Sequence, residues 1–197
     1  QRIFFDKSEG LIRGLDTEIS LNESFSILSE STARITIGAS FVSKYQADLN
    51  TQYILPENVG SWASRMNLNH GKWQFGAEYV HKYNDPSSAN NYIFKPGNAL
   101  LLSGAYSKRG FGISLAAKRI DNMDFRSERD QNLQNAIINY LPALTKQHAY
   151  TLATIYPYGT ISTGEMGLQT DLNYKFKKNS LLGGKYGMGL IANFSNV

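Results

Sequence analysis

Three features of the sequence predict an all-β protein, an up-and-down antiparallel transmembrane β-barrel. Apolar and polar residues alternate along each strand, short connections between strands alternate with long ones, and aromatic residues gather near both ends of the strands. Successive side chains of a strand point to opposite faces, so alternation gives each strand one apolar and one polar face. We count nine strands, or ten if residues 136–144 form one. We therefore expect residues 1–197 to be part of one barrel domain, a segment of a larger barrel.

Alternation defines the strands in order. It predicts them over residues 15–27, 34–41, 62–69, 73–82, 98–107, 111–118, 147–156, 166–176 and 186–194. The segment 136–144 is a weaker strand because Pro142 cannot donate to a ladder. The clearest hairpin is 62–83, where Gly71 permits a tight turn. Residues 1–14 are an unassigned lead-in.

Connection lengths favour a barrel over a soluble sandwich. Short turns are expected at 29–32, 70–72, 108–110, 145–146 and 177–180. Long outer loops are expected at about 45–60, 84–97, 120–134 and 157–165. Outer-membrane barrels show this asymmetry, with short periplasmic turns and longer outer loops, whereas a Greek-key sandwich has no reason to place its short turns at one end.

The same alternation assigns side chains to lipid or lumen. The expected lumen-facing charged residues are Arg34, Arg65, Glu78, Lys118, Asp171, Lys175 and Lys185. The expected aromatic girdles comprise Trp62, Trp73, Tyr79, Tyr83, Tyr106, Tyr174, Phe176 and Tyr186. A lysine or arginine facing lipid at the bilayer midplane costs about 2–4 kcal/mol, and a wet lumen removes that cost.

Composition excludes several classes of protein. The chain has no cysteine, so it has neither disulfides nor thiolate metal sites. Its net charge of +4 comes from 20 basic and 16 acidic residues that are well mixed, so we expect no nucleic-acid partner. No apolar run approaches the roughly 20 residues of a transmembrane helix.

Five segments carry a family resemblance: 55–67 (LPENVGSWASRMN), 84–101 (NDPSSANNYIFKPGNALL), 117–127 (AKRIDNMDFRS), 139–148 (NYLPALTKQH) and 164–187. They resemble an uncharacterised outer-membrane β-barrel family of Bacteroidota, a domain of unknown function. Its members look longer, so the resemblance implies the middle or C-terminal part of a barrel. It implies no activity and no catalytic residues.

The sequence offers little chemistry of its own. His70 and His148 fall beside short turns and His81 near the opposite rim, so the three histidines cannot share a metal. The charged loop around Asp121, Asp124, Glu128 and Asp130 lacks the order of an EF-hand, and interleaved arginines favour a solvated loop with internal ion pairs. We expect no catalytic, metal or cofactor site.

These observations predict an integral protein of the bacterial outer membrane without catalysis. It would act as a channel or uptake pore, or as an accessory subunit of an envelope complex, with membrane lipid and other envelope proteins as partners. One alternative is a soluble β-sandwich that binds glycans through Trp62 and Tyr83. Another is a barrel-embedded hydrolase, which would need a Ser/His or Asp/His pair within hydrogen-bond reach.

Overall fold

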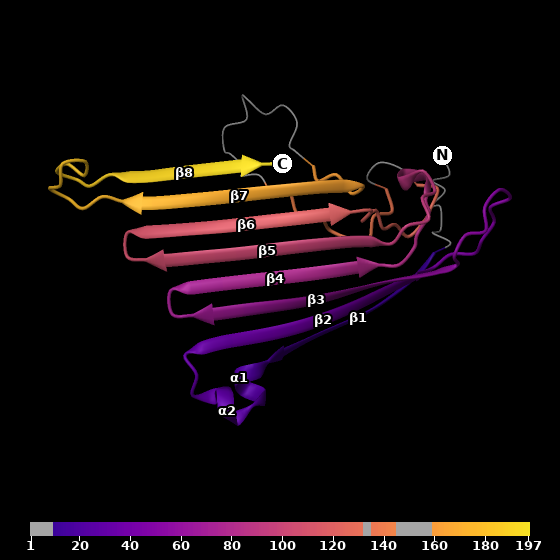
Figure 1. Ribbon diagram of the computed structural model, residues 1–197, viewed down its shortest axis with the longest axis horizontal. Helices are drawn as coiled ribbons and strands as arrows, with labels where there is room; N and C mark the ends of the chain where they lie inside the picture. Colours follow the sequence, from indigo (N-terminus) through magenta and orange to yellow (C-terminus); the bar gives the residue numbers. More distant parts are fainter. Residues whose placement is uncertain (1–9, 132–134, 145–158) are drawn as a thin grey trace, which may run out of the picture.

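A single antiparallel sheet dominates the computed structural model, which describes residues 10–131, 135–144 and 159–197 (Figure 1). Eight strands follow one another across the sheet in chain order. They are β1 (Leu11–Ser20), β2 (Ala33–Tyr45), β3 (Asn58–His70), β4 (Trp73–Lys82), β5 (Gly97–Lys108), β6 (Phe111–Asp121), β7 (Gly164–Lys175) and β8 (Gly189–Asn196). Three short helices complete the fold: α1 (Leu21–Ser24), α2 (Ser26–Ser29) and the 3-10 helix η1 (Ser88–Asn90). None of the described helices is long and apolar enough to cross a membrane.

The sheet is open. Each strand pairs with its neighbour in sequence, and β1 and β8 lie at opposite edges (Figure 1). The all-β class and the antiparallel, up-and-down order are confirmed. The described residues form eight strands rather than nine or ten, and they do not close into a barrel.

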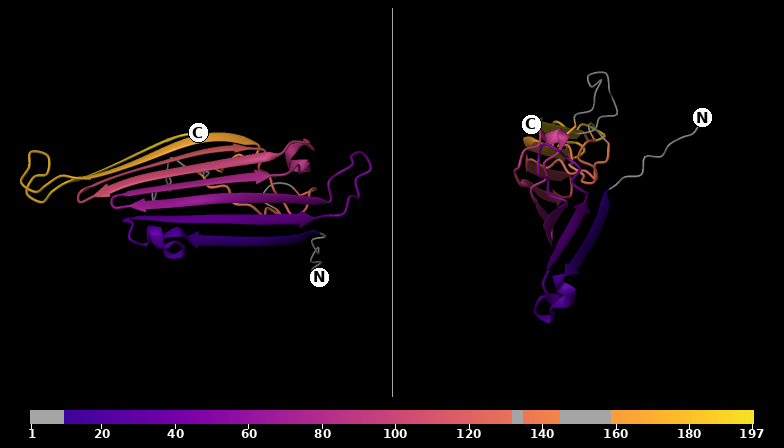
Figure 2. Two further views of the ribbon diagram at one scale, coloured as in Figure 1. Left: turned by 60° about the horizontal axis from the view of Figure 1, so that its bottom comes forward. Right: turned by 90° about the vertical axis from the view of Figure 1, so that its right-hand side faces the viewer.

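The connections divide between two ends of the sheet (Figure 2). The hairpin end holds connections 21–32, 71–72, 109–110 and 176–188, and the loop end holds 46–57, 83–96 and 122–163. Two hairpins turn over two residues each, with Gly71 at φ 57° and Gly110 at φ 80°. Glycine takes these positive angles without steric cost, which explains why both turns are so short.

Two predicted strands fall within the connection between β6 and β7. The predicted strand 136–144 is wrong, because its only strand-like feature is an isolated bridge between Arg126 and Ile137. Pro142 limits pairing there, and β6 pairs directly with β7 from Phe111 to Asp121. The predicted strand 147–156 lies outside the described residues, as does the turn at 145–146. The loops predicted at 120–134 and 157–165 both overlap the stretch between the end of β6 and the start of β7.

The first connection at the hairpin end is also longer than predicted. The sequence pattern extended the first strand to Ile27, but β1 ends at Ser20 and the chain enters α1 and α2. The buried side chain of Asn22 causes this fold: its Nδ2 donates to the carbonyls of Leu28 and Ala33, each at 2.8 Å. Alternation cannot anticipate a side chain that replaces backbone partners in this way.

The last hairpin differs in a similar way. The predicted turn at 177–180 extends over 176–188, and the Phe176 amide donates to the Met188 carbonyl at 2.8 Å. Within it, the Gly184 amide donates to the Ser180 carbonyl at 3.0 Å. Lys185 and Tyr186 therefore lie in this connection rather than on a strand, which corrects the predicted start of the last strand. Their assignments to the lumen and the girdle stay predictions.

Alternation gives the sheet two chemically different faces. We call the face that carries Phe75, Leu102 and Leu115 the apolar face, and the opposite one the polar face. At mid-strand these three side chains are 46%, 44% and 48% exposed, so no second described layer packs on them. The buried apolar residues of the described chain lie instead at the loop end, and comprise Leu55, Val59, Ile120, Met123, Phe125 and Leu144.

Candidate functional site: the covered loop end of the polar face

Part of the connection between β6 and β7 folds over the polar face at the loop end. We call its described residues, 122–131 and 135–144, the covering segment. Three lysines on alternate strands hold it by its backbone. Lys44 Nζ donates to the Arg126 carbonyl at 2.8 Å, Lys82 Nζ to the Asp124 carbonyl at 2.5 Å, and Lys118 Nζ to the Pro142 carbonyl at 2.8 Å. Buried carbonyls need partners, so these lysines satisfy a stretch of chain that forms no ladder.

Buried carboxylates balance part of this positive charge. Lys44 Nζ lies 2.7 Å from Asp85 Oδ2, and Lys118 Nζ lies 2.5 Å from Glu165 Oε1. All four side chains are at most 3% exposed. Such pairs contribute little net stability because both charges lose water. Removing one partner is nevertheless costly, because it leaves the other charge buried and unpaired. They therefore hold Lys44 and Lys118 in place beneath the covering segment.

The covering segment carries an ion pair of its own. Arg126 Nε lies 2.9 Å from Asp124 Oδ2, with both side chains at most 6% exposed, and Arg126 Nη1 donates to the Asn135 carbonyl at 2.7 Å. The sequence predicts a solvated loop here, and that interpretation is wrong for Asp124 and Arg126. The internal ion pair is present, but it is buried against the sheet rather than exposed to water.

Asn122 links the start of the covering segment to the neighbouring connection. Its Nδ2 donates to the Lys95 carbonyl at 2.6 Å, and its Oδ1 accepts from Asn90 Nδ2 at 3.2 Å. Nearby, the amides of Leu55 and Asn50 donate to the carboxylate of Asp48 and lower its pKa. Side chains therefore organise the loop end where ladder bonds are absent.

Gly97 allows the sheet and the covering segment to approach closely. A Cβ at this position would collide with the backbone carbonyl of Asn122, whereas one at Gly112 would have nothing within 4 Å. We expect Gly97→Ala to lower the free energy of unfolding by about 1–3 kcal/mol, the usual cost of overpacking. The matched Gly112→Ala variant should stay within about 0.5 kcal/mol of the wild type. Urea unfolding of both variants measures this, and equal stability would contradict the close packing.

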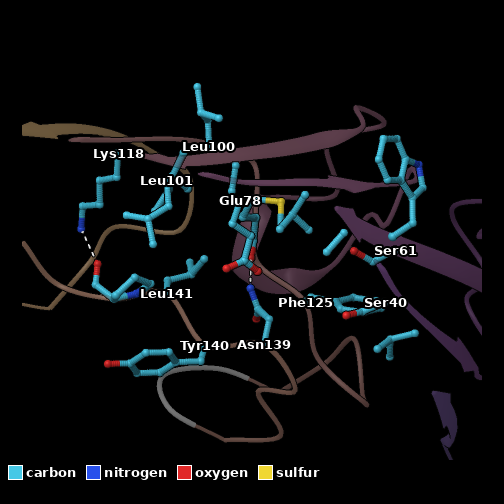
Figure 3. A pocket seen from close by; sticks show the side chains of 18 of the residues that line it. Ser40, Ser61, Glu78, Leu100, Leu101, Lys118, Phe125, Asn139, Tyr140 and Leu141 are labelled. Atoms are coloured by element: carbon cyan, nitrogen blue, oxygen red, sulfur yellow. Dashed lines mark hydrogen bonds between the residues drawn. The ribbon is translucent and has the colours of Figure 1, made fainter. Parts of the chain in front are cut away.

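A cavity of about 550 Å³ lies between the sheet and the covering segment (Figure 3). Leu101 and Glu78 point from the sheet toward the segment, whereas Leu100 points to the other side. The wall is mainly apolar, with Val80 on the sheet and Phe125 on the segment. Small-molecule sites have this size and character, with apolar walls and a few polar groups, so the cavity is the candidate binding site.

The predicted charged residues on strands occupy positions of the polar face, but only some of them make side-chain contacts there. Lys118 takes part in the covered site. Farther along, Arg65 joins three strands, with Nη2 at 2.5 Å from Asp16 Oδ1 and Nη1 donating to Ser40 Oγ at 2.6 Å. Asp171 accepts from Asn193 Nδ2 at 2.7 Å, on β8. Arg34 and Lys175 occupy polar-face positions near the hairpin end.

Aromatic rings form two rows on the apolar face. At the hairpin end, a continuous row of ring contacts crosses four neighbouring strands, with centroids 4.6–6.3 Å apart, through Trp73, Tyr106, Phe111, Tyr174 and Phe176. At the loop end, Trp62 contacts Tyr79 at 5.5 Å, and His81 contacts both Trp62 and Tyr83. Trp73 and His81 lie eight residues apart on β4, a span of roughly 26 Å.

The histidines do not converge. His70 ends β3 at the hairpin end, and His81 lies near the loop end of β4, where its Nδ1 is 2.8 Å from Asn98 Oδ1. His148 lies outside the described residues. Among residues 10–131, 135–144 and 159–197, no group of three or more acidic or histidine side chains could hold a metal ion.

Sequence reasoning missed several members of the site, among them Lys44, Asp85 and Glu165. Lys44 continues the polar alternation of its strand up to the long connection, and this was the available signal. Nothing in the local sequence pairs it with Asp85, which lies beyond two further strands.

Fold and site together define an all-β protein whose antiparallel sheet has one apolar, aromatic-bordered face and one polar face covered at one end. The chain belongs to the DUF6029 family, a family of unknown function that matches residues 1–197. No curated protein and no solved structure matches it. Membership of a family of unknown function is thus confirmed, and the Bacteroidota and outer-membrane parts of the resemblance stay predictions.

Proposed function

We propose that this chain is part of an integral outer-membrane β-barrel protein that acts as a channel or uptake pore, without catalysis. The observation that carries the proposal is the exposed apolar face between two aromatic rows. Soluble monomers rarely expose contiguous apolar patches larger than a few hundred Å², whereas barrels present such a band, about 25 Å tall, to lipid. Membrane lipid is therefore the proposed partner of this face.

The polar face supports the same proposal. Charges in the middle of the strands lie on this side, whereas Arg13, Lys108, Arg119 and Asp121 occupy apolar-face positions near strand ends. At the loop end, Lys44 and Lys118 are paired with carboxylates under the covering segment. Inside a barrel this face would line the lumen, and the covering segment would narrow it near the long connections. In lipid every backbone group needs a partner, so the outer edges of β1 and β8 must pair with further strands in the proposed barrel.

Single cysteines test the orientation of the sheet directly, because the natural chain has none. Leu115→Cys and Ser114→Cys place a bimane label on opposite faces of β6, at neighbouring positions in mid-strand. In lipid nanodiscs we expect nitroxide-bearing lipid to quench the label at 115 and aqueous iodide to quench the label at 114. Quenching of both labels by iodide would contradict the membrane location and favour the soluble glycan-binding alternative.

Conductance separates the two roles that the barrel leaves open. A channel should pass current in planar bilayers, and the current should rise when the covering segment is released. A barrel that follows the quenching pattern but passes no current, with the covering segment in place or released, would instead be an accessory subunit of an envelope complex.

A further inference from the structure

The cavity beneath the covering segment has the wrong walls for a hydrated ion or a sugar. Its buried surfaces include Ile120 on the sheet and Met123 and Phe125 on the covering segment, which are 4%, 2% and 3% exposed. Leu101 points from the sheet toward the segment (Figure 3). A solute that is polar all round would lose water against these apolar walls and regain few hydrogen bonds, which is costly. An apolar body would lose nothing and would exclude water from these side chains.

One acidic group lines this apolar space. Lys118, the other charged residue of the wall, is already engaged by Glu165, Pro142 and Thr160. The nearest cation to Glu78 in register is Arg65, its partner across β3 and β4.

The guanidinium of Arg65 interacts with the charge of Glu78, but its hydrogen bonds are made to other groups. It bonds Asp16 and Ser40, at 2.5 and 2.6 Å. In the part of the chain that the structure describes, no hydrogen-bond donor satisfies the Glu78 carboxylate. A ligand that brings a donor, and best a positive charge, can therefore gain a charge-assisted bond there.

We propose that this cavity binds a small apolar amine, an aryl or alkyl body with one ammonium group. The body lies against Leu101 and Phe125, and the ammonium donates to Glu78. This inference deepens the proposed function, on which it rests, by naming the class of solute that the lumen holds. The volume of about 550 Å³ accommodates a bicyclic aromatic ring with a short amine chain.

Dansylcadaverine is a suitable probe, because it joins an apolar fluorophore to a primary ammonium. Dansylglycine carries the same fluorophore with a carboxylate and serves as the matched probe. Titrated into the full chain in nanodiscs, the ammonium probe should bind saturably and about tenfold more tightly than the carboxylate probe, as expected for one charge-assisted bond.

Three variants connect this binding to the cavity. Ala99→Trp fills the cavity and should weaken dansylcadaverine binding at least tenfold, whereas Ala77→Trp, on the apolar face of β4, should leave it unchanged. Glu78→Gln should remove the preference for the ammonium probe while retaining binding of the apolar body. Binding that survives Ala99→Trp, equal affinities of the wild type for both probes, or no saturable binding would each overturn the proposal.

The cysteine experiment keeps this result separate from the proposed function. If the bimane labels show the membrane pattern but dansylcadaverine does not bind, the solute class is wrong and the membrane-embedded sheet stands. If the labels show the soluble pattern, the proposed function fails, and the probes still report on the cavity itself.

Discussion

Replacing Lys44 by Met is expected to release the covering segment from the sheet. The substitution removes the donor to the Arg126 carbonyl and leaves the buried Asp85 carboxylate with Arg129, at 3.9 Å, and with the more distant charge of Lys82. Breaking a buried pair from one side typically costs about 3–5 kcal/mol, because the remaining charge loses its close partner without regaining water. The folded sheet does not depend on this contact, so we expect local opening before global unfolding.

Trypsin measures this opening. Arg126 and Arg129 are 6% and 3% exposed, so cleavage after either residue requires the covering segment to leave the sheet. A cost of about 3 kcal/mol corresponds to more than a hundredfold rise in the open population, and in the cleavage rate that follows it. Lys72→Met, at an exposed turn of the hairpin end, serves as the matched control and should not change the rate. Unchanged cleavage in Lys44→Met would show that the lysines do not anchor the segment.

Placing a lysine at the middle of the apolar face should be the second large effect. Leu102 is 44% exposed on β5, and its neighbour Ser103 lies on the polar face. In the proposed barrel, Leu102→Lys should cost about 2–4 kcal/mol, since the charge would face hydrocarbon at mid-strand. Ser103→Lys should cost less than about 1 kcal/mol, because a wet lumen solvates the ammonium.

Unfolding from lipid vesicles in urea, followed by the fluorescence of Trp62 and Trp73, provides the measurement. The contrast between the two variants matters more than either value, because both add the same side chain to adjacent positions of one strand. Equal costs would contradict a lipid-facing apolar side. A soluble sheet would tolerate Leu102→Lys readily, since an exposed lysine in water carries no desolvation penalty.

Alternation predicts most of the sheet because it is a local property of each strand. Phe75 and Leu115 could be assigned to one face and Glu78 and Ser114 to the other without any partner strand. The side of each connection follows from the up-and-down order, so the division into two ends is predictable. Connection length is a weaker guide, because 21–32 and 176–188 at the hairpin end are as long as 46–57 at the loop end.

The covered site could not be predicted because it depends on contacts between distant side chains. Lys44 and Asp85 meet only after two strands and a long connection are in place. The charges of the covering segment resemble those of a solvated loop, and only their position over the sheet makes Asp124 and Arg126 buried. Likewise, Asn22 bends the chain through side-chain bonds to carbonyls, which leave no periodic signal.

All three lysine anchors recognise peptide oxygens, not side chains, of residues 124, 126 and 142. The position of the covering segment is therefore independent of which side chains it carries. Side chains facing the cavity, such as Met123 or Leu141, can be exchanged while the same three ammonium groups keep the chain in place. One scaffold could thus be refitted for different solutes by altering a few interior residues and leaving the strands untouched.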